Sequence, residues 1–362
     1  MSVSIRDIAL RAGVSTATVS LALRGSGRMS PNTRENVRLA AEELGYQAHP
    51  LLSKALSIVR QSGEQRYRET LAFIAEWDTE TGPEHQKEIY AAAFAKATKL
   101  GYKLESFLIS GRPAEHRRLC RMLRARGIRG LIVIPRLGSP QPRLHFEWRH
   151  FAAVEIGRTV WHPRNLHHVE TGAFAKVADA LHLLKKVGYR KIGMAIEPMQ
   201  NHHENGTFYA AFLLSQIRQP ARKRIPIFAP IGPWNEKAFR VWMTHHKPDV
   251  LYIHATLADL FCGWLKNMKF RVPQDVSLFC ANVQSDQWTG LRRDYGGMGR
   301  SAVEMLSLLL QNDELGLSGN PRCWQVDEFW QPGKTLSRPI DDYITSDGLL
   351  YSGEDAGAGR TA

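Results

Sequence analysis

Cysteine is scarce in this sequence, which has four cysteines among 362 residues and no CxxC pair. That distribution argues against a disulfide framework and favours buried free thiols in a reducing compartment. No apolar run reaches the ~18 residues of a membrane-spanning helix. The basic, amphipathic N-terminus also differs from a secretory signal peptide. We therefore expect a cytoplasmic protein with no membrane partner.

The sequence motifs of common enzymes are absent as well. It has no GxSxG, P-loop or GxGxxG pattern, so it offers neither a nucleophile elbow nor a phosphate-binding loop. Three histidine pairs occur, at 167–168, 202–203 and 245–246. Neighbouring residues of a helix or strand point to different faces, and no cysteine or carboxylate stands at ligand spacing. We expect no enzyme activity, no cofactor and no metal site.

Acidic residues are outnumbered by basic ones. The chain has 48 Lys and Arg against 35 Asp and Glu, a formal net charge of +13. The first 68 residues hold ten basic and five acidic side chains, a balance that favours a polyanionic partner. A second basic segment, 112–129, contains seven arginines and one glutamate. For this segment we expect a solvated helix face, with a second nucleic-acid surface as the alternative.

The first fifty residues carry three helix-start signals. Ser4 can cap a first helix, which ends at Gly13, a residue suited to the left-handed turn that follows a helix. Ser15 caps a second helix almost at once, and Ser30 followed by Pro31 begins a third. Because the first turn is short, the two helices must cross steeply, which leaves the second free to enter a major groove.

A small apolar core is expected to hold these three helices together. Its members recur at helical intervals and comprise Ile8, Val14, Val19, Leu23, Val37, Leu39, Ala40, Ala41 and Leu44. The alternative is three amphipathic helices of an ordinary helical domain. The pattern as a whole favours a helix-turn-helix head that binds double-stranded DNA.

From residue 70 onward, short apolar strands alternate with helices, which is typical of parallel sheets covered on both faces. Strands are predicted at 71–75, 103–109, 130–134, 151–156, 191–196, 225–229, 250–253 and 276–280, and helices at 84–100, 113–126, 172–187 and 207–217. Roughly 275 residues are too many for one such domain, so we expect two α/β lobes. The predicted divisions are a head at 1–49, a hinge helix and linker at 50–69, a two-lobed effector-binding and dimerisation domain at 70–345, and a disordered tail at 346–362.

The head resembles that of the lactose-repressor (LacI/GalR-type) family of bacterial transcriptional regulators. The likeness is carried by residues 5–46, IRDIALRAGVSTATVSLALRGSGRMSPNTRENVRLAAEELGY. A looser likeness covers residues 4–340, through HLLKKVGYRKIGMA (182–195), FRVPQDVSLF (270–279) and GRSAV (299–303). It implies a hinge helix and a body like periplasmic sugar-binding proteins, with two lobes joined by three crossovers. It also implies a homodimer, or a tetramer of dimers, on a near-palindromic operator.

The resemblance assigns roles within the head. Thr16 and Ala17 fall on the first exposed turn of the recognition helix, where side chains reach base edges. Leu21 stands where many relatives carry an arginine that reads guanine, so it either contacts a thymine methyl or packs within the head. Phosphate contacts are assigned to Ser15, Thr18, Ser20, Arg24 and Arg28, and Ser4 completes the DNA-binding set.

The hinge departs from the family pattern. Relatives pair two hinge helices in the minor groove and wedge an apolar side chain into a base step. Here Leu56 is the expected wedge, although the phase places Ala55 near the usual position. Ala48 and His49 replace the usual proline–asparagine pair. The alternative is a flexible linker that only tethers the head.

The same resemblance implies which residues line the effector site. Trp234 stands where relatives often place an aromatic that stacks on a sugar, with a structural tryptophan as the alternative. The other expected cleft residues are Trp77, Asp78, Arg136, Trp161, His203, Asn205, His254, Asn282 and Gln284. Several carboxylates and an arginine of the family are replaced, among them an aspartate replaced by Gly157. The altered set disfavours a common hexose and favours an unusual carbohydrate, another metabolite or no ligand.

Together these observations predict a ligand-responsive transcriptional regulator, a repressor in the first instance. Closure of the cleft and ordering of the hinge helix would be energetically coupled. The second reading is a DNA-binding protein of the same build whose cleft has lost ligand sensing. A third, an enzyme on this α/β scaffold, lacks any recognisable catalytic constellation.

Overall fold

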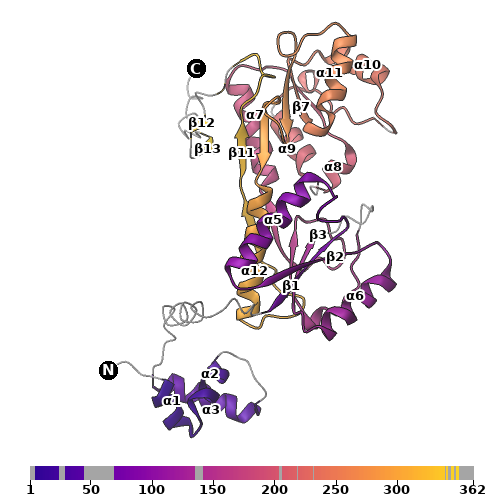
Figure 1. The fold of residues 1–362 in the computed structure, drawn as a ribbon. Coiled ribbons are helices and arrows are strands. Elements are labelled where there is room, and N and C mark those ends of the chain that lie inside the picture. The colour runs from indigo at the N-terminus through magenta and orange to yellow at the C-terminus, as the bar shows by residue number, and fades with distance from the viewer. Residues whose placement is uncertain are drawn as a thin grey trace, which may run out of the picture.

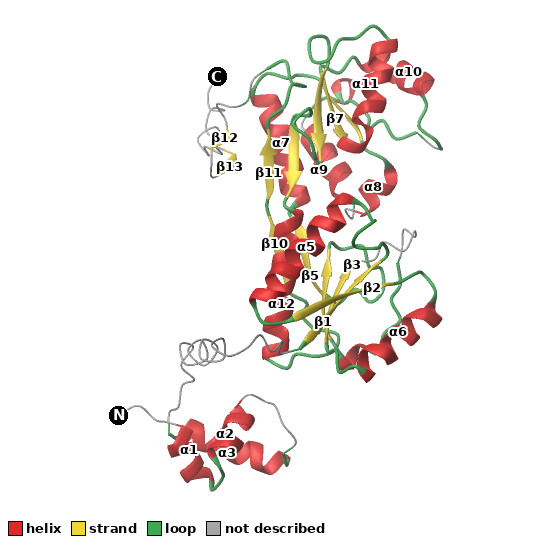
Figure 2. Cartoon of the chain, viewed as in Figure 1, coloured by secondary structure: helices red, strands yellow, loops and turns green. Residues whose placement is uncertain are grey.

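The computed structural model consists of a helical head followed by a two-lobed α/β body (Figures 1 and 2). It describes residues 5–23, 29–44, 69–134, 142–203, 206–217, 219–230, 232–338, 340, 344–345 and 348–349. Of the predicted hinge helix and linker at 50–69, residues 50–68 lie outside these residues. Within the segment expected to be a disordered tail, β13 (Gly348–Leu349) pairs antiparallel with β12 (Ile344–Thr345).

The head is a three-helix unit of α1 (Ile5–Ala12), α2 (Thr16–Leu23) and α3 (Pro31–Glu43). The predicted start of α3 is confirmed, since Ser30 Oγ accepts a hydrogen bond of 3.1 Å from the N–H of Thr33. Ile8, Val19 and Val37 are fully buried between the helices, as the helical spacing predicts. Leu39 was expected in this core and is instead 44% exposed, because it lies on the outer side of α3. Leu23 is the last residue of α2.

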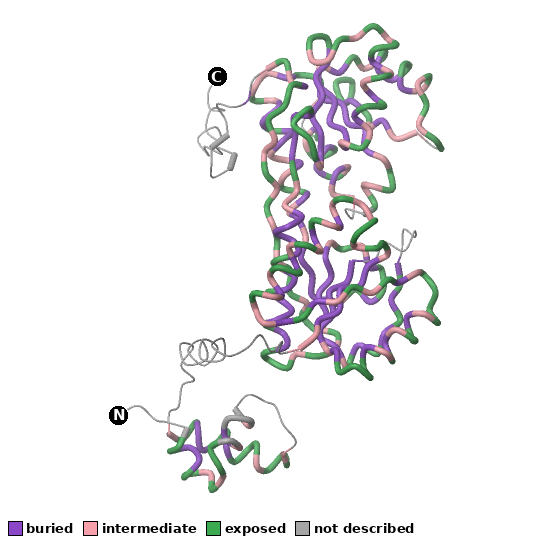
Figure 3. Tube along the Cα trace, viewed as in Figure 1, coloured by how far each residue is buried: buried purple, intermediate pink, exposed green. Residues whose placement is uncertain are grey.

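The first lobe is built on a parallel sheet with strand order β10-β5-β4-β3-β1-β2. Helices α5 and α12 pack on one face of the sheet, and α6 packs on the other. Buried residues follow the strands of both lobes in Figure 3. The bounds are β1 Thr70–Ala75, β2 Lys103–Leu108, β3 Gly130–Ile134, β4 Ala152–Ile156, β5 His167–Thr171, β10 Cys323–Val326, α5 Glu84–Lys99, α6 Pro113–Ala125 and α12 Tyr295–Gln311, with a 3-10 turn at Trp148–His150.

The second lobe has the strand order β11-β9-β8-β7-β6, with β11 antiparallel to its neighbour. Helices α7 and α9 cover one face, and α10 and α11 cover the other. The bounds are β6 Ile192–Ala195, β7 Val250–His254, β8 Ser277–Ala281, β9 Gly290–Arg293, β11 Glu328–Gln331, α7 Ala173–Lys186, α8 Pro198–His203, α9 Thr207–Gln216, α10 Glu236–His246 and α11 Ala258–Asn267, with 3-10 turns at Ala221–Lys223 and Ala255–Leu257.

Three crossovers join the lobes. β5 leads into α7, β9 leads into α12, and β10 leads into β11, so the chain passes between the two sheets at 171–173, 293–295 and 326–328. The expected two-lobed body with three crossovers is therefore confirmed.

One predicted strand is wrong. Residues 225–229 lie along β6 but form no ladder, and the N–H of Phe228 donates to the carbonyl of Met194 at 2.8 Å. The reason is local, because Pro226 and Pro230 have no N–H to donate and so interrupt any continuous pairing.

The arginine-dense segment is helix α6, and its outer face meets solvent as expected. Arg117, Arg118 and Arg121 are exposed on this face. Arg124 and Arg126 form surface ion pairs with Glu147 and Glu105, at 2.9 and 2.6 Å. None of the helices in the described part of the chain combines the length and hydrophobicity needed to cross a bilayer.

Gly299 lets α12 pack closely against α5. A Cβ at this position would lie 2.3 Å from the carbonyl oxygen of Ile89, so the two backbones would have to separate. We expect Gly299→Ala to lower the free energy of unfolding by about 2 kcal/mol. Gly263 on α11 is the matched control, because its Cβ would meet nothing within 4 Å. Gly263→Ala should raise stability by about 0.5–1 kcal/mol. The denaturant midpoints of the two full-length variants measure these effects. Equal shifts in Gly299→Ala and Gly263→Ala would contradict a close approach of α12 to α5 at Gly299.

Candidate nucleic-acid interface and effector cavity

The start of α2 is held by a short turn and a serine cap. Gly13 adopts φ +66, the left-handed conformation that ends α1. Ser15 Oγ accepts a hydrogen bond of 3.1 Å from the N–H of Thr18 and lies 2.8 Å from Thr18 Oγ1. The capped end presents Thr16, the first residue of the helix, with an exposed side chain. A helix N-terminus presented in this way offers backbone N–H groups and a positive dipole end to an anion.

The other predicted DNA-contacting residues divide into two groups. Ala17, Ser20 and Leu21 lie within α2. Outside the described residues lie Ser4, Arg24, Arg28 and Leu56. The hydroxyls of Ser15 and Thr18 are hydrogen-bonded to each other in the cap, and one of them donates in that bond. The hydrogen of the other hydroxyl is left to donate to a phosphate oxygen.

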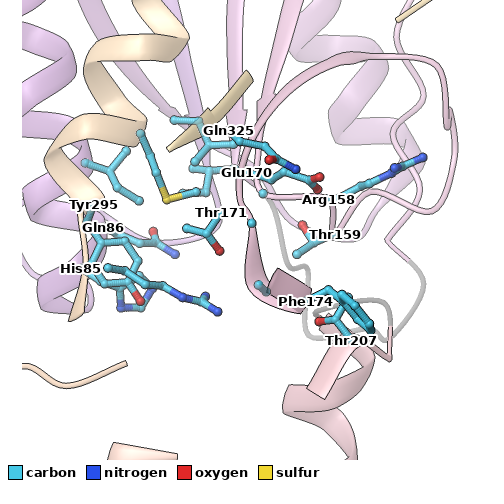
Figure 4. A pocket seen from close by; sticks show the side chains of 18 of the residues that line it. His85, Gln86, Arg158, Thr159, Glu170, Thr171, Phe174, Thr207, Tyr295 and Gln325 are labelled. Carbon is cyan, nitrogen blue, oxygen red and sulfur yellow. The ribbon is translucent and has the colours of Figure 1, made fainter. Parts of the chain in front are cut away.

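A cavity of about 770 Å³ lies where the crossovers leave the first lobe (Figure 4). Its lining includes Thr171 and Arg293, which begin the first and second crossovers, and Gln325, which comes just before the third. Ile89, Ile134, Ile156 and Met298 supply apolar surface, and His85, Gln86, Arg158, Glu170 and Tyr295 supply polar groups. This mixture of apolar surface and a few polar groups is typical of a small-molecule site.

An aromatic ring from the second lobe borders this cavity. Phe174, on the first turn of α7, is 41% exposed and lies beside Thr207 of α9 (Figure 4). Arg158 and Thr159 come from the loop after β4 in the first lobe. A ligand in the cavity would therefore touch both lobes.

Two of the predicted cleft residues lie one layer behind the cavity. Tyr295 lines it, and its hydroxyl donates a 2.9 Å hydrogen bond to Asn282 Oδ1. Asn282 Nδ2 lies 3.5 Å from Nε2 of the buried His254, whose Nδ1 lies 2.8 Å from Thr256 Oγ1. Asn282 and His254 can thus orient Tyr295, and neither is among the lining residues.

A buried ion pair spans two of the crossovers. Arg293 Nε lies 3.0 Å from Glu328 Oε1, and the two side chains are only 10% and 6% exposed. Arg293 also lines the cavity. Because a buried charge that loses its partner is costly, this pair resists separation of the second and third crossovers.

A buried carboxyl group supports the loop that carries Arg158. Glu155, on β4, accepts a 2.7 Å hydrogen bond from the N–H of Val160. Complete burial raises the pKa of Glu155 to about 8, against the hydrogen bonds from the loop, which lower it. The group is therefore mostly protonated at neutral pH.

The three predicted tryptophans lie away from the cavity lining. Trp234 packs in the second-lobe core, 5.2 Å from the ring of Phe228 and 5.5 Å from that of Phe261. The ring of Trp161 is covered by the guanidinium of Arg164 at 4.3 Å. Trp77 follows β1 and is half exposed.

Three further predicted cleft residues, Asp78, Gln284 and His203, are not among the lining residues. Asp78 accepts hydrogen bonds from the N–H groups of Glu80 and Thr81, which lower its pKa, so it shapes a turn. Gln284 is exposed, and His203 is the last residue of α8. Arg136 and Asn205 lie outside the described residues.

Sequence reasoning missed most of the lining residues. Glu170 and Thr171 end β5, a strand that was not predicted because His167, His168 and Glu170 leave no apolar run. Arg158 and Thr159 follow a strand that was predicted, so the rule that ligands gather at the carboxyl ends of parallel strands could have found them.

Comparison with known proteins gives two matches along the chain. Residues 4–49 match the family described as "Bacterial regulatory proteins, lacI family". The head is therefore a DNA-binding domain of the lacI family. Residues 181–318 match the "Periplasmic binding protein-like domain", and the two matches together cover about half of the chain. The expected family and the expected class, a DNA-binding transcriptional regulator, are confirmed.

The curated relatives match in two different ways. The maltose regulon regulatory protein MalI of Escherichia coli is 57% identical over 44 residues, which are 12% of this chain and 13% of MalI. The HTH-type transcriptional repressor PurR of Salmonella paratyphi B is 24% identical over 323 residues, which are 84% of this chain and 89% of PurR. High identity is thus confined to a short segment, whereas the whole lacI-family architecture is shared at low identity.

Solved structures share the fold. The lac repressor dimer bound to operator and the anti-inducer ONPF is 17% identical, with a TM-score of 0.54 over 93% of this chain and all of that one. The CelR–cellobiose complex is also 17% identical, with a TM-score of 0.53 over 92% and 99% of the two chains. A putative lacI-family regulator from Rhizobium etli, 16% identical, has a TM-score of 0.57 over 74% and 98%.

Proposed function

We propose that this protein represses transcription by binding a near-palindromic operator as a homodimer, or as a tetramer of two dimers. The observation that carries the proposal is the capped, exposed start of α2, where Thr16 is presented on a helix-turn-helix head. Two such helices related by a twofold axis would read two half-sites of the operator. A protein acting on chromosomal DNA would work in the cytoplasm.

Exposed apolar side chains on the second lobe support a partner copy. Leu213 and Leu214 on α9, and Ile217 just after it, are each more than half exposed. Contiguous apolar residues on a surface helix are typical of an interface.

We further propose that a small, polar, carbohydrate-related effector binds in the 770 Å³ cavity. Phe174 offers a ring face for the C–H side of a sugar, and Arg158, Glu170 and Gln325 offer polar groups for hydroxyls or an acidic substituent. Solved structures that share the fold include complexes with cellobiose, glucose and sucrose. The assignment of Trp234 to stacking remains a prediction, and Phe174 is the ring proposed for stacking in this cavity.

The position of the cavity supports a mechanism of regulation. Because its lining residues lie in two crossovers and next to the third, a ligand would bind one arrangement of the lobes better than another. Coupling between sites of this kind typically amounts to about 1–3 kcal/mol. Operator affinity would then change about 5- to 150-fold on effector binding.

Selection of bound sites from random duplexes tests the operator proposal. We expect the full chain to enrich a near-palindromic sequence, and enrichment of no sequence would overturn it. The selected duplex is then titrated with protein in the presence of neutral, acidic and phosphorylated sugars. A change of affinity with one of them supports the effector proposal. No change across the panel would favour a regulator whose cleft has lost ligand sensing.

Phe174→Ala is expected to weaken binding of the effector found in this way by up to about tenfold, since a stacked ring contributes about 0.5–1.5 kcal/mol. Operator affinity without effector should not change. Phe94→Ala is the matched control, because Phe94 is similarly exposed, at 46%, and lies outside the cavity on α5. Isothermal titration calorimetry measures both. Equal losses in the two variants would argue against this cavity as the effector site.

A further inference from the structure

Three side chains with metal-binding groups meet on one face of the first-lobe sheet. β5 and β10 pair in parallel, with Cys323 opposite His168 and Gln325 opposite Glu170. Alternate residues of a strand share a face, so His168, Glu170 and Cys323 lie on the same side of the pair. Their ligand atoms all lie within 4.8 Å of one another.

The histidine has an unsatisfied buried nitrogen. His168 is 6% exposed, and its Nδ1 lies 3.3 Å from the carbonyl oxygen of Leu166. Donation from Nδ1 to this carbonyl leaves the lone pair on Nε2, which is the arrangement found at metal-bound histidines. Within the described part of the chain, Nε2 has no hydrogen-bond partner and is buried. A buried polar atom without a partner costs free energy unless something binds it.

The spacing of the other two ligands suits a small ion. Cys323 Sγ lies 3.5 Å from Glu170 Oε1. In a tetrahedral zinc site, with Zn–S near 2.3 Å and Zn–O near 2.0–2.1 Å, these two atoms are separated by about 3.5 Å. A thiolate, an imidazole and one carboxylate form a set that selects Zn²⁺ or a similar transition ion over Mg²⁺ or Ca²⁺.

We propose that His168 Nε2, Cys323 Sγ and Glu170 bind a divalent transition-metal ion, with Zn²⁺ as the best match. Cys323 is exposed on the edge strand β10, which gives the ion a path from solvent. Glu170 also lines the cavity, so a fourth, open coordination position would lie beside it. Strand pairing brings residues 168 and 323 together, which is why the sequence alone predicted no metal site.

An ion bound here would link β5 and β10, the strands that lead into the first and third crossovers. β5 continues at Thr171 into the first crossover, and β10 continues at Val326 into the third. Bonds from one ion to both strands would resist their separation, and a ligand that binds only the folded state raises its stability. Added Zn²⁺ should therefore raise the melting temperature of the full chain.

Competition for Zn²⁺ against a chromophoric chelator tests the site in the full-length protein. We expect one strongly bound Zn²⁺ per chain, and at least tenfold weaker binding in Cys323→Ser and in His168→Gln. Cys262→Ser is the matched control, since Cys262 is a partly exposed thiol on α11 of the other lobe. It should bind Zn²⁺ as the unchanged protein does.

Co²⁺ provides a second measurement that does not depend on the buried histidine variant folding. We expect a near-ultraviolet thiolate-to-cobalt absorption band that disappears in Cys323→Ser and persists in Cys262→Ser. The absence of this band, or Zn²⁺ binding unchanged in Cys323→Ser, would overturn the proposal. Zn²⁺ binding through His245 and His246 of α10 would give the second of these results.

Discussion

Thr16→Glu is expected to lower operator affinity by about a hundredfold or more. Thr16 is exposed at the capped start of α2, the edge of the head proposed to enter the major groove. A glutamate there would bring a negative charge towards the phosphates and would replace a base contact of about 1–3 kcal/mol. The head should still fold, because its core of Ile8, Val19 and Val37 is not altered.

Leu10→Glu is the matched control for this prediction. Leu10 lies on α1 of the same head and is 83% exposed, so the variant adds the same charge outside α2. Fluorescence anisotropy with the selected duplex, at fixed salt, should show near-normal affinity for Leu10→Glu. Equal losses in both variants would show that the added charge alone weakens binding, and that the start of α2 does not read the operator.

Glu155→Gln is expected to remove a pH-dependent part of the stability of the body. The pKa of Glu155 is raised to about 8 in the folded protein, above the ordinary value of 4.5. Between pH 4.5 and about pH 8, folding is therefore accompanied by uptake of a proton by Glu155. The resulting stabilisation is complete below about pH 4.5 and is lost as the pH rises through 8. Between pH 5 and pH 8 the loss is on the order of 3 kcal/mol.

Glutamine has the same shape and does not titrate, and its amide oxygen can still accept the hydrogen bond from Val160. The variant should therefore gain stability relative to the unchanged protein as the pH rises from 5 to 8. Urea unfolding of the full chain at several pH values measures this difference. Glu80→Gln, at an exposed position of the same lobe, should show no such trend. A difference that is constant with pH would show that Glu155 is ionised throughout this range.

Local signals were enough to place the helices of the head. The serine caps, Gly13 and the helical spacing of apolar residues act within a few residues of chain, and the structure has α1, α2 and α3 where they indicate. The buried strands β1, β3 and β7 were equally visible, because an apolar run bounded by polar residues needs no distant partner to be recognised.

Elements that depend on distant partners were not visible. β5 contains two histidines and a glutamate, and β10 lies at the sheet edge, so neither has the apolar pattern of a buried strand. The neighbours of Trp234 could not be predicted either. Its place in the chain suggested a stacking role, with a structural role as the alternative, and its ring packs against Phe228 and Phe261. A side chain's neighbours are set by the whole fold and not by its place in the chain.

The sequence by itself determined the family, the head and the alternation of strands and helices, since capping, periodicity and composition are properties of short segments. Only the tertiary structure decided which residues meet. Pairing of β5 with β10 brings His168 to Cys323, and three crossovers bring Phe174, Glu170 and Tyr295 around one cavity. The reason is physical, because the cavity is made from segments as far apart as His85 and Gln325, and no local preference encodes their contact.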